Sequence, residues 1–253
     1  MSFGRYGGGT CEHWSASEAS GGRFSNYDVC MQSVRMEVEA VLFDYGLVLT
    51  GPPDPASWEE MKRVTRLEEA KFSAAYWAPR LSYDKGLLTG REYWLAVGRH
   101  GGVTLHANVV DALIAADNRL WTQINQPMAD WAMRLQAART RTGVLSNLGD
   151  EMMHGVLAAF PWLHRFDHHT WSHTLKMAKP QREIYAHAAA GMGVVAGAIL
   201  FVDDRADNVQ GALDAGMQAI CYTTQGEFEQ DLMKRGHADL WLTGSSSPRP
   251  TAR

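Results

Sequence analysis

Reactive polar side chains end three of the most apolar segments of this sequence, and a lysine stands just before a helical segment. The residues concerned are Asp44, Ser146 with Asn147, Lys179, and the adjacent pair Asp203 and Asp204. In an open sheet of parallel strands, ligands bind in the crevice outside the carboxyl ends of the strands. We therefore expect these side chains to converge on one site.

This combination of side chains suits phosphoryl transfer. That reaction needs an oxygen nucleophile in line with the leaving group, and positive charge around the phosphoryl oxygens. A carboxylate can act as the nucleophile through an acyl phosphate, which divides one difficult step into two easier ones. Clustered carboxylates repel one another and an incoming phosphate, so a lysine and a hard cation such as Mg²⁺ are needed to neutralise them.

The segments that position these residues alternate between strand and helix patterns. Nearly continuous apolar runs, typical of parallel strands buried on both faces, cover residues 38–44, 143–147, 198–204, 218–222 and 239–242. Helical segments lie between them; Pro127 and Pro180 mark two helix starts and Gly216 marks one helix end. The alternation predicts the α/β class, with a doubly wound, parallel, Rossmann-like sheet.

One long stretch breaks this alternation. From about residue 54 to 126 the pattern is helical, and the run from Thr89 to Glu92 is a capping box that starts one of the helices. We interpret this stretch as a helical module inserted after the first strand. The predicted division is a core of 36–53 and 127–244, an inserted module of 54–126, and disordered ends at 1–35 and 245–253.

Composition excludes several classes of protein. The 253 residues carry a formal charge of −4, with no basic excess that indicates nucleic-acid binding. No apolar run approaches the roughly 20 residues of a membrane helix, and the first residues lack the apolar core of a secretory signal. Three widely spaced cysteines do not suggest a disulfide framework, so we expect a reducing, cytoplasmic setting. The sequence leaves the oligomeric state open.

The residues that carry the chemistry resemble the four motifs of the haloacid dehalogenase (HAD) superfamily. The matching stretches are Phe43–Thr50 (FDYGLVLT), Val144–Asn147 (VLSN), Lys179–Pro180 with Ile184–Tyr185, and Phe201–Asp204 (FVDD) with Asp207–Asn208, Gly211–Ala212 and Ala215–Met217. They extend over about residues 38 to 242. The long interval between Asp44 and Ser146 matches a helical C1-type cap, and Tyr83–Thr89 looks like the usual turn of that cap.

The resemblance implies a role for each of these residues. Asp44 corresponds to the nucleophile, which also binds Mg²⁺ together with the carbonyl of Gly46 and the carboxylate of Asp203. Asp204 corresponds to a supporting carboxylate that can exchange roles with Asp203. Ser146, Asn147 and Lys179 correspond to the residues that bind the phosphoryl oxygens of the substrate, a small phosphorylated metabolite.

One position departs from the usual phosphatase motif. The residue two places after the nucleophile is commonly an aspartate that acts as general acid and base, and here it is Gly46. General acid catalysis contributes about 10²–10⁴ in rate. The pattern of Gly46 with the later Ser-Asn and Asp-Asp pairs resembles bacterial glucose-1-phosphate phosphatases. A good leaving group, a substrate acid or a cap residue such as His100 are the possible replacements. Lys176 also departs, since Gly is common there.

Two further groups of residues attract attention. His168, His169 and His173 have a spacing that suits zinc, but we favour structural or solvated roles for them. Most of the tryptophans at 58, 77, 94 and 121 are expected in the core of the inserted module, with one or two lining the substrate pocket.

Three functions compete on these grounds. The first is a Mg²⁺-dependent phosphohydrolase that acts through an aspartyl phosphate on Asp44, and it is the one we favour. The second is a 2-haloacid dehalogenase, which uses an aspartate but no metal. The pair Asp203 and Asp204 argues against it, because a metal-free site gains nothing from their repulsion. The third is a catalytically weak binding or regulatory protein that kept the fold.

Overall fold

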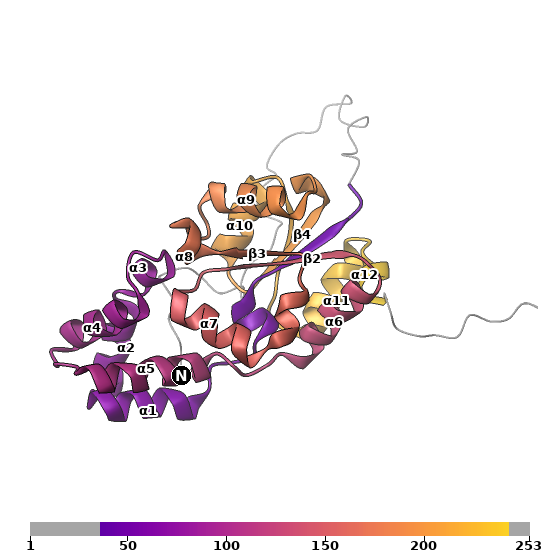
Figure 1. Cartoon of the computed structure of the whole chain (residues 1–253). Coiled ribbons are helices and arrows are strands. Elements are labelled where there is room, and N and C mark those ends of the chain that lie inside the picture. Colours follow the sequence, from indigo (N-terminus) through magenta and orange to yellow (C-terminus); the bar gives the residue numbers. More distant parts are fainter. Residues whose placement is uncertain (1–35, 243–253) are drawn as a thin grey trace, which may run out of the picture.

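A five-stranded parallel sheet forms the centre of the computed structural model, which describes residues 36–242 (Figure 1). The strands are β1 (Ala40–Phe43), β2 (Arg141–Ser146), β3 (His168–Trp171), β4 (Ile199–Asp203) and β5 (Gln218–Cys221). They lie in the order β3-β2-β1-β4-β5, with every neighbouring pair parallel. The predicted doubly wound α/β fold is confirmed. The ends that we predicted to be disordered lie outside the described residues.

Helices cover both faces of the sheet. α9 (Arg182–Met192) and α10 (Ala206–Asp214) lie on one face, and α6 (Gln126–Ala137), α7 (Asp150–Ala159) and α11 (Gln225–Lys234) lie on the other (Figure 1). Strand β1 serves both layers, because successive side chains of a strand point to opposite faces. Leu42 packs with the α9 and α10 layer, whereas Phe43 packs with the α6 layer. This double burial explains why the strands read as continuous apolar runs.

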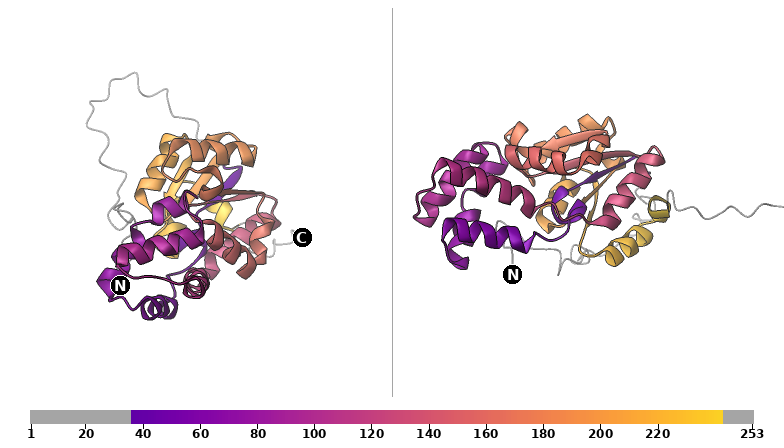
Figure 2. Two further views of the ribbon diagram at one scale, coloured as in Figure 1. Left: turned by 60° about the vertical axis from the view of Figure 1, so that its left-hand side comes forward. Right: turned by 60° about the horizontal axis from the view of Figure 1, so that its bottom comes forward.

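A group of helices, which we call the helical lobe, lies to one side of this core (Figure 2). It consists of α1 (Pro55–Thr65), α2 (Glu69–Trp77), α3 (Arg80–Asp84), α4 (Gly90–Gly101) and α5 (Ala107–Leu120). Aromatic side chains fill its interior, where Trp58 meets the rings of Phe72 and Tyr76 edge to face. The predicted capping box at Thr89 is present. The division of the chain into core and inserted cap stays a prediction.

Two adjacent connections join the helical lobe to the core. The outgoing chain forms a bridge with the returning chain at Thr50 and Ile124. The Gly51 N–H donates to the Gln123 carbonyl at 2.7 Å, and the Asn125 N–H donates to the Leu49 carbonyl at 3.0 Å. Because these bonds hold the two connections side by side, the helical lobe has a fixed exit next to the end of β1.

The last predicted strand is wrong. Residues 239–242 belong to a short helix, α12 (Ala238–Leu242). Another short helix, α8 (Ser172–Leu175), directly follows β3. Periodicity cannot distinguish strand from helix in so short an apolar run. In the structure this segment serves side-chain packing instead of sheet pairing. Trp241 packs against Trp131 and Phe228, and the Trp131 indole N–H donates to the Leu240 carbonyl at 2.9 Å.

Two predictions about cellular setting have different outcomes. Within residues 36–242, no helix combines the length and apolar character needed to cross a membrane. Cys221 is disulfide-bonded, which contradicts the expectation of reduced cysteines for this residue. The cytoplasmic location stays a prediction.

Candidate active site

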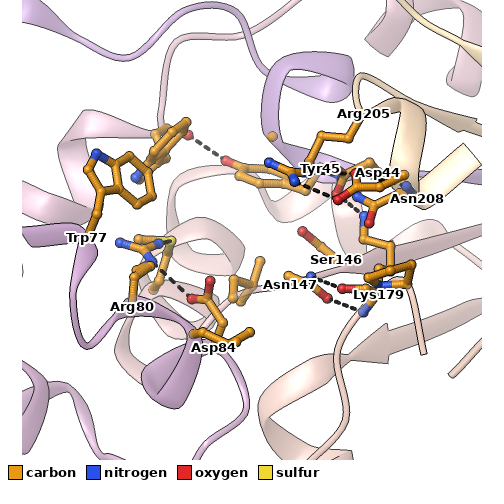
Figure 3. Close-up of a pocket in the computed structure, with 17 residues that line it drawn as sticks. Asp44, Tyr45, Trp77, Arg80, Asp84, Ser146, Asn147, Lys179, Arg205 and Asn208 are labelled. Carbon is orange, nitrogen blue, oxygen red and sulfur yellow. Dashed lines mark hydrogen bonds and ion pairs between the residues drawn. The ribbon is translucent and has the colours of Figure 1, made fainter. Parts of the chain in front are cut away.

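The residues predicted at the strand ends do meet at the carboxyl edge of the sheet. Asp44, Ser146, Asn147 and Lys179 line one cavity there (Figure 3), and Asp203 and Asp204 lie close to Asp44. Phe43 pairs in register with Val144 on β2 and with Val202 on β4. Asp44, the next residue, is therefore level with Leu145 and with Asp203, and its N–H donates to the Val202 carbonyl at 2.8 Å. The register of three neighbouring strands thus brings together residues far apart in the sequence.

Lys179 lies between two of the carboxylates. Its Nζ is 2.8 Å from Oδ1 of Asp44 and 2.6 Å from Oδ2 of Asp203, and it donates to the Leu145 carbonyl at 3.0 Å. The lysine is only 4% exposed. A buried ammonium group is stable only where anions and hydrogen-bond acceptors surround it. Lys179 therefore acts as the counter-charge of the carboxylate cluster.

The carboxylates perturb one another strongly. The pKa of Asp203 is raised to about 7, mainly by burial and also by the charges of Asp44 and Asp204, against the lowering by Lys179. Burial lowers the pKa of Lys179, but attraction to Asp203 and Asp44 outweighs burial and leaves the pKa raised. The cluster holds three carboxylates against one lysine, so it has an excess of negative charge. That excess favours binding of a cation.

The donor atoms fit a magnesium ion. Carboxylate oxygens of Asp44, Asp203 and Asp204 lie within 4.8 Å of one another, and no other such group of potential metal ligands occurs in residues 36–242. Mg²⁺ prefers oxygen ligands, usually one or two carboxylates plus water and phosphate. Gly46 also lines the cavity, so its carbonyl is a further candidate ligand.

The turn after β1 aims Asp44 at the cavity. Residues Tyr45–Leu49 form one wide turn with non-helical backbone angles at Gly46 and Leu47, closed by the Thr50 N–H donating to the Tyr45 carbonyl at 3.0 Å. Oδ1 of Asp44 accepts the Tyr45 N–H at 2.7 Å and also binds Lys179. Both contacts use Oδ1, so neither of them occupies Oδ2.

Ser146 and Asn147 take different positions. Ser146 is the last residue of β2 and lines the cavity. The side chain of Asn147 instead pairs with the backbone of Lys179, accepting its N–H at 2.9 Å and donating to its carbonyl at 3.0 Å. The Asn147 side chain therefore positions the lysine. A contact of Asn147 with phosphate, which the sequence suggested, requires its backbone N–H.

Sequence reasoning missed the residues that support Asp203. The Asn208 amide donates to both carboxylate oxygens of Asp203, at 3.0 and 3.1 Å, and the Arg205 N–H donates to Oδ1 at 2.9 Å. The Arg205 guanidinium forms two hydrogen bonds with Asp207, at 3.0 and 2.7 Å. The stretch after Asp203 was noted as a motif, but the sequence alone did not show which side chains turn back to the carboxylate.

A cavity of about 180 Å³ connects this site to the helical lobe. Ser146, Asn147 and Lys179 lie on one side, and Trp77, Arg80 and Asp84 of the helical lobe lie on the other (Figure 3). Leu81 of the helical lobe and Trp121, which follows α5, also line the cavity. The cavity therefore places side chains of the helical lobe where they can contact a ligand bound at the strand ends. The expectation that one or two tryptophans line the pocket is confirmed.

Two of the three histidines bond to backbone carbonyls, which agrees with the structural roles that we favoured. The ring of His169 bonds to the Leu163 carbonyl at 2.8 Å, and that of His173 bonds to the Leu148 carbonyl at 3.0 Å. Burial lowers the pKa of both. His100, which we considered as a replacement acid, is exposed and is not among the residues that line the cavity. Lys176 is exposed, and its Nζ donates to the Gly86 carbonyl of the helical lobe.

Comparison with known proteins connects this geometry to a family. Residues 38–216 match the family of haloacid dehalogenase-like hydrolases. Phosphatase MT3486 of Mycobacterium tuberculosis (strain CDC 1551 / Oshkosh) is 28% identical over 208 residues, which are 79% of this chain and 94% of that protein.

Solved structures share the fold. A HAD family enzyme of Bacteroides thetaiotaomicron matches with a TM-score of 0.66 and 23% identity, covering 78% of this chain and 99% of that one. The same enzyme in complex with magnesium and inorganic phosphate has a TM-score of 0.63 and 24% identity. The match covers 74% of this chain and 96% of that chain. L-2-haloacid dehalogenase of Xanthobacter autotrophicus has a TM-score of 0.57 and 18% identity. The match covers 85% of this chain and 91% of that chain.

Proposed function

Since the chain belongs to the haloacid dehalogenase-like hydrolases, we propose that it is a Mg²⁺-dependent phosphohydrolase that acts on a small phosphorylated metabolite. The observation that carries this proposal is the carboxylate cluster of Asp44, Asp203 and Asp204 around the buried Lys179. A phosphatase relative and a magnesium-phosphate complex of a structural neighbour agree with it. On this proposal, the helical lobe is the cap of the family.

Each residue of the site then has a part in the reaction. Oδ2 of Asp44 attacks phosphorus, the bond to the leaving-group oxygen breaks, and an aspartyl phosphate forms. Attack of water on this intermediate releases phosphate and restores Asp44. Lys179 neutralises both the carboxylates and the phosphoryl oxygens, and the Ser146 hydroxyl donates to one of these oxygens. Bound to Asp44, Asp203 and the Gly46 carbonyl, Mg²⁺ would supply charge neutralisation.

The competing functions fit the site less well. A dehalogenase that uses no metal has no use for three carboxylates gathered within 4.8 Å, because their repulsion weakens the site without helping the reaction. The likeness to L-2-haloacid dehalogenase, at 18% identity, extends to the fold alone. A weak binding protein has no need for the nucleophile, the lysine and the acidic cluster together.

We expect hydrolysis of p-nitrophenyl phosphate to require Mg²⁺ and to stop when a chelator is added. The reason is that the cluster remains negatively charged after Lys179 is counted, so it repels a phosphate dianion until a cation binds. Release of p-nitrophenol, followed with and without metal and after adding Mg²⁺ back, measures this. Full turnover in chelator would reject the proposed Mg²⁺ dependence, because hydrolysis of the phosphate ester would then not need the cation.

We also expect activity to depend steeply on the leaving group. With Gly46 in place of the usual acid, an alkoxide must leave without protonation, whereas a nitrophenolate leaves as a stable anion. Gly46→Asp should flatten the dependence of kcat/KM on leaving-group pKa, because it should raise kcat/KM for alkyl phosphates by about 10². Gly46 has φ −70°, a conformation that an aspartate adopts without strain.

A series of aryl and alkyl phosphates, assayed with the wild type and with Gly46→Asp, makes the comparison. Magnesium affinity serves as the control, since the carbonyl at position 46 remains in the variant. A flat dependence in the wild type would mean that another residue already supplies the proton.

A further inference from the structure

The side of the cavity that faces the helical lobe contains a buried ion pair that the proposed phosphoryl transfer does not use. Arg80 and Asp84, one turn apart on α3, are 4% and 3% exposed, and both line the cavity. Nε of Arg80 is 3.0 Å from Oδ1 of Asp84. Figure 3 shows the pair across the cavity from Asp44 and Lys179. A group attached to a phosphate at Asp44 therefore extends toward this pair.

The charge of Arg80 is already balanced. Besides Asp84, its guanidinium faces Oδ2 of Asp117 at 3.6 Å, and Asp117 accepts the hydroxyl of Tyr76 at 2.7 Å. Burial raises the pKa of Asp117 and Arg80 lowers it, so the cluster carries a net charge between zero and −1. Nothing in it offers positive charge to a second anionic group of a substrate.

The other cations that line the cavity are balanced as well. Arg205 is paired with Asp207, and Lys179 lies between Asp44 and Asp203. A carboxylate or second phosphate on the leaving group would therefore enter a low-dielectric cavity without a counter-charge, which is unfavourable.

Hydrogen-bonding capacity remains for an uncharged group. Nη2 of Arg80 has the Met152 sulfur as its acceptor, at 3.1 Å, and a thioether is a weak acceptor. A hydroxyl oxygen entering the cavity is a better acceptor for this N–H, and the hydroxyl proton can be donated to Asp84. Apolar surface from Trp77, Trp121 and Leu81 surrounds the pair and suits the carbon skeleton of such a group.

We propose that Arg80 and Asp84 form the leaving-group subsite. They select phosphate monoesters whose leaving group is uncharged and carries hydroxyls, and they disfavour monoesters with a carboxylate or a second phosphate. This inference rests on the proposed phosphohydrolase activity.

Glycerol 3-phosphate and 3-phosphoglycerate test the inference as a matched pair. Both lose phosphate from a primary alcohol, and they differ mainly in the distant hydroxyl or carboxylate. We expect glycerol 3-phosphate to have about tenfold or higher kcat/KM, and a correspondingly lower inhibition constant against p-nitrophenyl phosphate. Equal values, a preference for 3-phosphoglycerate, or no inhibition by either compound at millimolar concentration would overturn the subsite.

A charge change at the pair provides the second arm. Asp84→Asn makes the subsite one charge more positive, so the ratio of inhibition constants should shift about tenfold toward 3-phosphoglycerate. Asp111→Asn is the matched control, because Asp111 is an exposed carboxylate of α5 paired with Arg91 outside the cavity lining. Equal shifts in both variants would reject the subsite.

The two hypotheses fail in different ways. If p-nitrophenyl phosphate is not hydrolysed with Mg²⁺, the proposed function itself fails. If it is hydrolysed but the matched pair is not distinguished, only the subsite fails. The wild-type comparison decides the matter even if Asp84→Asn does not fold, because the loss of a buried partner of Arg80 is destabilising.

Discussion

Replacing Asp44 with Asn is expected to reduce kcat by at least about a thousandfold, while the protein stays folded. Asn cannot attack phosphorus effectively, and no second oxygen nucleophile of the site occupies its position after β1. The amide oxygen of Asn still accepts the Tyr45 N–H and the Lys179 ammonium, which bind Oδ1 at 2.7 and 2.8 Å in the wild type. The substitution therefore removes one reacting atom and very little packing.

The stability of this variant gives a second, independent readout. The pKa of Asp203 is raised to about 7, above the roughly 4 of an unfolded chain. A carboxyl group whose pKa is raised by folding stabilises the folded state at pH values below its unfolded pKa. This stabilisation is lost as the pH rises through its folded pKa. Asp44 is one cause of the rise. Without its charge, the metal-free protein should lose less stability on going from about pH 5.5 to about pH 8.

Thermal unfolding in chelator at the two pH values, with kcat from p-nitrophenyl phosphate plus Mg²⁺, completes the test. We expect Asp44→Asn to unfold at the same temperature as the wild type or higher, with the larger gain at the higher pH. Retention of more than a few per cent of activity, roughly, would show that Asp44 is not the nucleophile. An inactive variant that melts far below the wild type would not support the assignment, because unfolding would explain the loss.

The sequence predicted the core of the site because its geometry follows from simple rules. Parallel strands end at the same edge, so polar residues that close apolar runs must meet there. Asp44, Ser146 and Asp203 each obey this rule, and the register of the strands places Asp44 level with Asp203 and one residue short of Ser146. Lys179 was found through its motif, since nothing in its local pattern predicts that a loop lysine is buried.

Residues whose position depends on tertiary packing were not predicted. Arg80 and Asp84 lie at helical spacing, and such pairs are usually exposed on helices. What makes them different is the placement of α3 against the core, where the Ser172 hydroxyl donates to the Asp84 carbonyl at 2.5 Å and the Met152 N–H donates to the Tyr83 hydroxyl at 3.3 Å. Long-range contacts of this kind leave no periodic signal in the sequence.

The same distinction explains the error at the C-terminal end. A four-residue apolar run is compatible with an edge strand or with a short helix, and local pattern cannot choose between them. The packing of Trp241 against Trp131 of α6 and Phe228 of α11 favours the helix. A second role of Asn147 was not predicted. Its side chain is bonded twice to the backbone of Lys179, and binding of phosphate by Asn147 stays a prediction.

Replacing Lys179 with Met is expected to have the opposite effect on stability from Asp44→Asn. The variant leaves three carboxylates gathered without a cation, and Asp44 and Asp203 are 4% and 0% exposed. Removing one partner of a buried ion pair typically costs about 3–5 kcal/mol of unfolding free energy. The loss should be largest in chelator near neutral pH and smaller in acid, where protonation of Asp203 relieves the repulsion. Loss of positive charge at the phosphoryl oxygens should also lower kcat by about 10²–10³.

Lys176→Met is the matched control, because Lys176 lies three residues earlier on the same connection, is exposed, and reaches the Gly86 carbonyl instead of the cluster. Both variants remove one lysine charge and keep a similar side-chain length. Urea unfolding in chelator, at acidic and neutral pH, compares them with the wild type. We expect the free energy of unfolding of Lys176→Met to stay within about 0.5 kcal/mol of the wild-type value at both pH values. If Lys179→Met behaved the same way, the carboxylates would not need this ammonium group, and the electrostatic account of the site would be wrong.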